Sequence, residues 1–105
     1  MILGQVVGTV VATEKDHSLD GRKMLVVQPV DIVSFERAGG CLVALDVVGA
    51  GDGEIVMVVG GSSARLAEGL ENKVPTDSTI TAIIDSVKVH GTSVYDKSAH
   101  EAEVP

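Results

Sequence analysis

Apolar and polar positions alternate near the start of the chain, over residues 2–13. Every even-numbered position there is apolar or glycine, whereas several odd-numbered positions are polar. Because successive side chains of a strand point to opposite faces, this pattern predicts a strand whose even face lies in the core. Gly4 and Gly8 fall on that face, which is typical of a strand that bends sharply in a small barrel.

Later apolar runs, rich in valine and isoleucine, are separated by short segments that contain glycine, aspartate or proline. Such runs are typical of strands, which we expect at residues 22–30, 41–48, 54–59, 80–89 and 93–96. The first two strands should form a hairpin, and residues 31–40 a connecting loop. We place a short helix at residues 64–68, capped by Ser62 or Ser63. A single domain over residues 1–96 would then be followed by a polar tail, residues 97–105.

The runs 41–48 and 54–59 are apolar on both faces. An antiparallel strand with one solvent-exposed face should instead alternate apolar and polar residues. In a chain of 105 residues, the most available cover for a second apolar face is another copy of the chain. The pattern therefore predicts an oligomer of a small all-β domain.

Composition narrows the class of protein further. The net charge is −7, and Phe35 and Tyr95 are the only aromatic residues. Nucleic-acid binders need basic tracks and, for single strands, stacking rings, so nucleic acid is disfavoured as a partner. The acidic balance also disfavours anionic membrane surfaces. A core of branched aliphatic residues fits a small barrel or sandwich best.

Features that report on the cellular compartment point to the cytosol. The single cysteine, Cys41, has no partner for an internal disulfide, and we expect it to be a small buried apolar residue. The N-terminal residues lack a basic segment, so we do not expect a signal peptide. No apolar run reaches the roughly 18 residues of a membrane span.

A glycine loop, Gly49-Ala50-Gly51-Asp52-Gly53, lies between the two doubly apolar runs. We expect positive φ at its glycines, Gly51 included, and a close approach of another backbone. A dinucleotide fingerprint would lead into a helix, whereas this loop leads into a strand, and Asp52 and Glu54 would repel a phosphate. The loop is therefore predicted to be a structural turn or a subunit contact.

The other polar residues form no recognisable catalytic or metal-binding pattern. The carboxylates are isolated in sequence, the three histidines lack metal-ligand spacing, and Ser62 and Ser63 lack a nucleophile elbow. We assign these two serines to helix capping, with pore lining as the functional alternative. Asp85 interrupts an apolar run, and Arg65 is the natural partner for its carboxylate if it is buried. No cofactor is expected.

Taken together, these segments resemble the vertex proteins of bacterial microcompartments, the family of the carboxysome and ethanolamine-utilisation pentamers. The resemblance runs almost end to end, leaving out the loop 31–40 and the tail. Its most specific parts are Asp46-x-Val48-Gly49-Ala50-Gly51-x-Gly53-Glu54 and Gly61-Ser62-Ser63-Ala64-Arg65. Further matches are Met1-Ile2-Leu3-Gly4, Leu19-x-Gly21-x-Lys23-Met24-Leu25, Val27-Gln28-Pro29, Pro75-x-Asp77 and Ile83-x-Asp85.

The resemblance implies an OB-like five-stranded barrel that assembles into a pentamer and closes the vertices of an icosahedral shell in the bacterial cytoplasm. It implies a structural, non-catalytic role, hexameric and pseudohexameric shell proteins as partners, and a narrow central pore. Under it, Gly49, Gly51, Gly53, Glu54 and Arg65 shape the subunit contact, and Ser62 and Ser63 lie near the five-fold axis. Two alternatives remain: an OB-type module that binds an oligonucleotide or a sugar, and a small enzyme that uses acidic residues.

Overall fold

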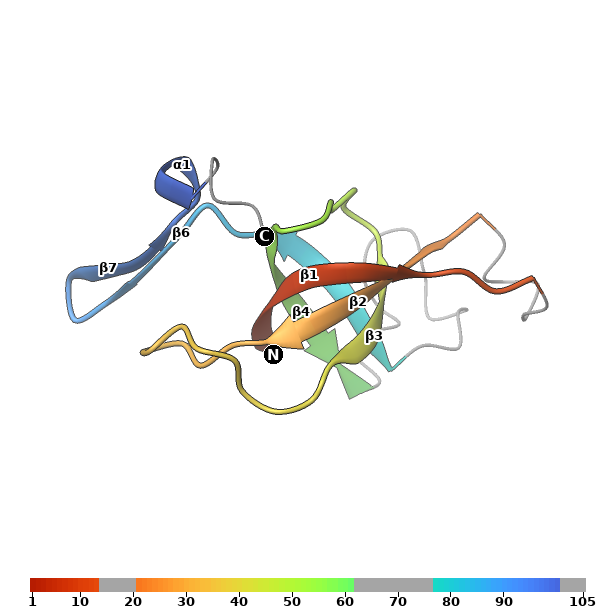
Figure 1. Ribbon diagram of the computed structural model, residues 1–105, viewed down its shortest axis with the longest axis horizontal. Coiled ribbons are helices and arrows are strands. Elements are labelled where there is room, and N and C mark those ends of the chain that lie inside the picture. The colour runs from red at the N-terminus through yellow and green to blue at the C-terminus, as the bar shows by residue number, and fades with distance from the viewer. Residues whose placement is uncertain (14–20, 62–76, 101–105) are drawn as a thin grey trace.

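A closed barrel of five strands forms the body of the molecule (Figure 1). The computed structural model describes residues 1–13, 21–61 and 77–100. The strands neighbour one another in the order β1–β2–β3–β5–β4, and every neighbouring pair is antiparallel except β3 with β5. Their bounds are β1 (Ile2–Val10), β2 (Lys23–Pro29), β3 (Leu42–Asp46), β4 (Ile55–Gly60) and β5 (Ser78–Ile83). The predicted five-stranded all-β barrel and its first hairpin, β1 with β2, are confirmed.

The interior of the barrel is filled by small and branched aliphatic side chains, as the composition predicts. Because such side chains have few rotamers and no polar atoms, they pack a narrow barrel without needing a large ring. The buried cluster consists of Val6, Leu25, Val27, Ala44, Ala50, Val56, Val58 and Ile80.

The alternation in β1 continues only as far as a β-bulge between Val6 and Gly8. Val6 pairs with Val27 and is buried, but Gly8 pairs with Val26, which lies on the opposite face of β2 from Leu25 and Val27. A Cβ atom built on Gly8 would lie 3.6 Å from the Val26 side chain. The prediction that Gly8 lies on the core face is therefore wrong, because one extra residue inverts the alternation.

Gly4, which precedes the bulge, does lie on the core face and is buried. A Cβ atom at this position would lie 2.5 Å from Cγ1 of Val27 and 2.9 Å from the carbonyl oxygen of Gln28. No ordinary side chain fits in that space. The glycine therefore allows β1 to approach β2 closely where the barrel curves.

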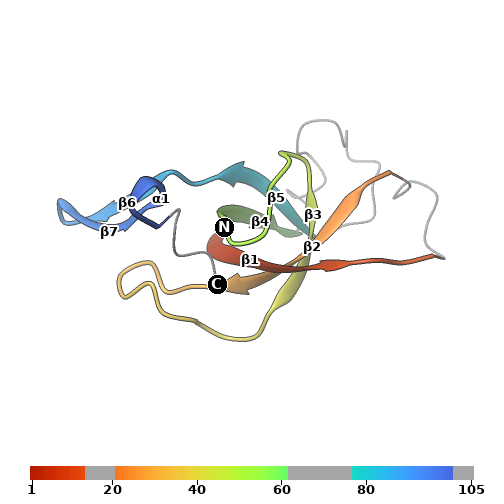
Figure 2. The same cartoon turned by 45° about the horizontal axis from the view of Figure 1, so that its top comes forward.

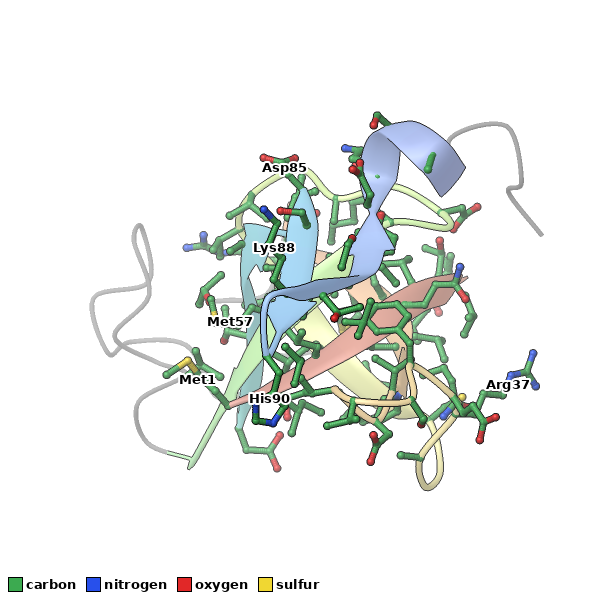
Figure 3. The ribbon with its side chains drawn as sticks, turned by 90° about the vertical axis from the view of Figure 1, so that its left-hand side faces the viewer. Met1, Arg37, Met57, Asp85, Lys88 and His90 are labelled. Carbon is green, nitrogen blue, oxygen red and sulfur yellow. The ribbon has the colours of Figure 1, made fainter. Side chains whose placement is uncertain are left out.

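The predicted single strand over residues 80–89 is in fact two strands. β5 ends at Ile83, and a separate strand, β6 (Ser86–Val89), begins after Asp85. Asp85 is exposed and lies at the junction, where its side chain points away from the barrel (Figure 3). Its carboxylate therefore needs no buried partner, and the suggested partner Arg65 lies outside the described residues.

β6 pairs with β7 (Thr92–Asp96) in a two-stranded sheet of its own, which we call the arm. The arm turns at His90 and Gly91, whose φ angles of 52° and 76° are typical of the type I′ turn of tight hairpins. Figures 1 and 2 show it projecting from one end of the barrel. One helical turn, α1 (Lys97–His100), follows, so the segment predicted as a polar tail begins with ordered structure.

The loop of residues 31–40 lies beside the arm and is organised by Asp31. Its Oδ1 accepts hydrogen bonds from the amides of Val33 and Ser34, each at 2.9 Å. These two amides lower the pKa of Asp31, the amide of Ser34 having the larger effect. Phe35 then adopts a left-handed φ of 60°, and its ring stacks on Tyr95 of the arm with centroids 5.2 Å apart. The loop and the arm are thus joined by the only two aromatic residues of the chain.

Cys41 follows this loop and is exposed. Its thiol lies 3.4 Å from Oε1 of Gln28, a polar side chain that is itself buried and also donates to the carbonyl of Gly39. The prediction of a buried apolar cysteine is wrong, because strand β3 begins one residue later and leaves Cys41 outside the strand.

Candidate functional site

The glycine loop connects β3 to β4 and takes its shape from two of its three glycines. Gly49 and Gly53 have φ angles of 78° and 84°, in the left-handed region that favours glycine. Gly51 lies outside that region, so the prediction of a positive φ there is wrong. A Cβ atom on Gly51 would lie 3.5 Å from Oε1 of Glu54, an ordinary contact.

Asp46, the last residue of β3, holds the first half of the loop. Its carboxylate accepts hydrogen bonds from the amides of Val48 at 3.1 Å and Ala50 at 2.9 Å, and the residue is only 8% exposed. Nζ of Lys23 lies 3.9 Å from Oδ2 of Asp46 and donates to the carbonyl of Ala50 at 2.9 Å. One carboxylate thus satisfies two loop amides that the turn leaves without strand partners.

Glu54 holds the second half of the loop and ties it to the far end of the chain. Its Oε1 accepts from the amide of Gly51 at 2.6 Å, and its Oε2 accepts from Nζ of Lys97 at 2.7 Å. The hydrogen bond from Lys97 is the main reason that the pKa of Glu54 is lowered, and the same bond raises the pKa of Lys97. The amide of Lys97 also donates to the carbonyl of Asp85.

Other polar groups of the loop form hydrogen bonds with β1 of the barrel. The amide of Gly53 donates to the carbonyl of Val6, the amide of Val6 donates to the carbonyl of Glu54, and Nε2 of Gln5 donates to the carbonyl of Gly53. The loop is therefore fixed in shape by contacts within a single copy of the chain.

This arrangement argues against an anion site in the loop. A phosphate cradle presents free backbone amides to its ligand. Here the amides of Val48, Ala50 and Gly51 already donate to the carboxylates of Asp46 and Glu54. A bound phosphate would have to displace these carboxylates and would be repelled by them. The geometry supports a rigid structural element.

Four residues predicted for the subunit contact, Gly49, Gly51, Gly53 and Glu54, lie together in this loop. The fifth, Arg65, and the pore candidates Ser62 and Ser63 lie outside the described residues, as does the predicted helix over residues 64–68. The sequence analysis did not identify Asp46 as the residue whose carboxylate holds the first half of the loop. The available signal was an aspartate placed just before a glycine-rich turn, a position from which its side chain can accept loop amides.

Within residues 1–13, 21–61 and 77–100, no group of three or more histidine, cysteine or carboxylate side chains is arranged to hold a metal ion. No helix in this part of the chain has the length and apolarity to cross a membrane.

Gly49 and Gly51 differ enough in their backbone conformation to be tested as a pair. Gly49→Ala should lower the free energy of unfolding by about 1–2 kcal/mol, because alanine resists a left-handed φ and nothing else obstructs its Cβ atom. Gly51→Ala should change it by no more than about 0.5 kcal/mol. Urea unfolding at one fixed protein concentration measures both. If both variants lost the same free energy of unfolding, the difference in backbone conformation between Gly49 and Gly51 would be contradicted.

The bond between Glu54 and Lys97 predicts a pH dependence. A carboxylate whose pKa is lowered by folding contributes stability above its unfolded pKa, about 4.5, and loses that contribution as pH falls through the folded pKa. Glu54→Gln should therefore be less stable than the unmodified chain at pH 7 and converge with it in acid. Glu36→Gln, which changes an exposed carboxylate, is the control. Parallel stability profiles for Glu54→Gln and the unmodified chain would contradict the prediction.

Comparisons with known proteins agree on one family. The family model described as "Ethanolamine utilisation protein EutN/carboxysome" matches residues 1–85. The carboxysome shell vertex protein CcmL of Synechococcus elongatus is 45% identical over 104 residues, which cover 95% of this chain and 99% of that protein. The microcompartment shell vertex protein GrpN of Rhodospirillum rubrum is 46% identical over 88 residues, covering 84% and 97%.

Solved structures give the same result. CcmL of Gloeobacter violaceus superimposes with a TM-score of 0.87 at 38% identity, covering 93% of this chain and 99% of that one. The structure described as the pentameric microcompartment shell protein GrpN of Rhodospirillum rubrum superimposes with a TM-score of 0.76 at 43% identity, covering 85% and 99%.

Proposed function

The chain belongs to the EutN/CcmL family, and from this we propose that it is a vertex protein of a bacterial microcompartment shell that assembles as a homopentamer. The observation that supports this most directly is the match of its barrel, over most of both chains, to a relative that is itself pentameric. The role is structural and non-catalytic. A sheet of hexagonal tiles is flat, so a closed shell requires five-fold units at its vertices.

The glycine loop suits a subunit contact in such a ring. In a closed ring each copy presents two different surfaces, one to each neighbour, and both must keep their shape. The loop is held by Asp46, by Glu54 and by the backbone of β1, so little of it has to be ordered on assembly. We assign Gly49, Gly51, Gly53 and Glu54 to this contact together with Arg65. We assign Ser62 and Ser63 to the region of the five-fold axis.

The proposed partners are other copies of the chain and the hexameric and pseudohexameric proteins of the same shell. The proposed location is the microcompartment shell in the bacterial cell. Both assignments rest on relatives that are named as shell vertex proteins.

A barrel of this strand order is also compatible with an OB-type binding module, but the two aromatic residues disfavour that function. Phe35 and Tyr95 stack on each other, and Tyr95 is only 6% exposed, so they offer no platform for bases or sugars. A labelled single-stranded oligonucleotide should show no shift with micromolar protein, and a shift would favour the binding module.

Shell closure tests the proposed function. The hexameric shell protein from the same microcompartment should form open sheets or tubes alone and closed polyhedra when it is produced with this chain. Electron microscopy of the two preparations distinguishes these outcomes. Closed polyhedra without the chain, or open assemblies with it, would contradict a vertex role.

A further inference from the structure

The loop of residues 31–40 and the arm together form a unit that we call the lobe. They are far apart in sequence but lie side by side at one end of the long axis (Figures 1 and 2). The molecule extends 43 Å along this axis and 25 Å and 23 Å across it. The stack of Phe35 on Tyr95 joins the two segments, and the bond from Lys97 to Glu54 ties the base of the arm to the glycine loop.

The lobe presents apolar side chains that the single chain leaves uncovered. Ile32 is 48% exposed and Val33 is 66% exposed, although the hydrogen bonds to Asp31 hold their turn in one conformation. A two-stranded sheet is also only marginally stable without further packing. The lobe is therefore a preformed projection that carries exposed apolar side chains. Arg37 of the same loop extends away from the body of the molecule (Figure 3).

A second apolar surface lies on the outside of the barrel. Gly8, Val26 and Val43 are register neighbours across β1, β2 and β3, on the face opposite the core residues. Val43 is 49% exposed, and Val7 in the bulge is 47% exposed. Because Gly8 adds no side chain, another chain can approach this surface closely. We call it the outer face.

We propose that the lobe of one copy docks on the outer face of the next copy around the ring, with Ile32 and Val33 against Val26 and Val43. This rests on the proposed function, because a ring requires two different, complementary surfaces on each copy. The lobe and the outer face are two such surfaces, one on the projection and one on the barrel. Docking removes apolar surface from water on both sides.

The same geometry gives the candidate site a second role. Glu54 contacts the glycine loop through Gly51 and the arm through Lys97. The direction of the lobe relative to the barrel is therefore coupled to the loop that we assign to the subunit contact. The lobe and the glycine loop of one copy are thus tied to each other by one carboxylate.

A charge-swap experiment tests the proposal. Val33→Asp and Val43→Lys each place a charge in the proposed apolar contact, and each should raise the concentration at which the ring dissociates by about tenfold or more. The double variant should regain much of the loss, because opposite charges then meet across the contact. Val11→Asp is the control, since Val11 is 86% exposed, lies beyond the end of β1 and belongs to neither surface.

Sedimentation across a concentration series measures assembly, and circular dichroism confirms that each variant is folded. Intact rings in both single variants would overturn the proposal, as would two dissociated single variants that the combination does not restore. If the unmodified chain is itself monomeric, the proposed function fails. If the unmodified chain forms rings that the single variants leave unchanged, only the docking proposal fails.

Discussion

Replacing Asp46 by alanine is expected to lower the free energy of unfolding by about 2–4 kcal/mol, because it leaves two loop amides without acceptors. The residue is 8% exposed, so water does not readily replace the lost carboxylate. Asp46→Asn should lose less, because a single amide oxygen can still accept from Val48 or Ala50. Lys23 lies 3.9 Å away with a half-exposed side chain, so the ion pair itself adds little.

Asp52→Ala is the matched control for this prediction. Asp52 lies in the same loop, carries the same charge and is exposed, so its loss should change stability by no more than about 0.5 kcal/mol. Chemical unfolding of the three variants at one protein concentration gives the comparison. If Asp46→Ala and Asp52→Ala unfold at the same urea concentration, the carboxylate of Asp46 does not organise the loop.

Gly4→Ala is the second change with a large expected effect, a loss of about 2–3 kcal/mol from overpacking. The new methyl group would meet Cγ1 of Val27 and the carbonyl of Gln28 well inside van der Waals distance. Relief requires β1 to move away from β2, which would disturb the buried cluster. The melting temperature and the urea midpoint both report this change.

Gly8→Ala is the control, because its methyl group meets Val26 at an ordinary 3.6 Å. In the monomeric chain, where the outer face is uncovered, Gly8→Ala should stay within about 0.5 kcal/mol of the unmodified chain. Gly4→Ala should cost less in a chain that already carries Val27→Ala, since that change removes the nearest obstructing atom. Equal effects of Gly4→Ala and Gly8→Ala would contradict the close approach of β1 to β2.

The strand pattern in the sequence predicts the barrel well where the alternation is regular. The hairpin of β1 with β2 and the place of Gly4 follow from it. The bulge beyond Val6 cannot be predicted in this way. One extra residue leaves no recognisable pattern in a segment made mostly of valine and glycine. The same ambiguity hides the break at Asp85, where the strand stops although the apolar residues continue on both sides.

The sequence predicts that the glycine loop lies between two strands, but it does not show what holds the loop in shape. The glycine loop stands out in the sequence, whereas the reason that it is rigid lies in contacts over long distances. Lys97 and Glu54 are 43 positions apart in the chain, and no local sequence pattern predicts a bond between them. The exposure of Cys41 likewise depends on where β3 begins, and strand ends are poorly defined by composition.

The number of copies in the native complex decides whether this chain is a vertex protein. Native mass spectrometry of the purified full chain measures that number directly. The vertex role predicts one dominant species of five copies. A chain that stays monomeric at high concentration, or a ring of six copies, would contradict it.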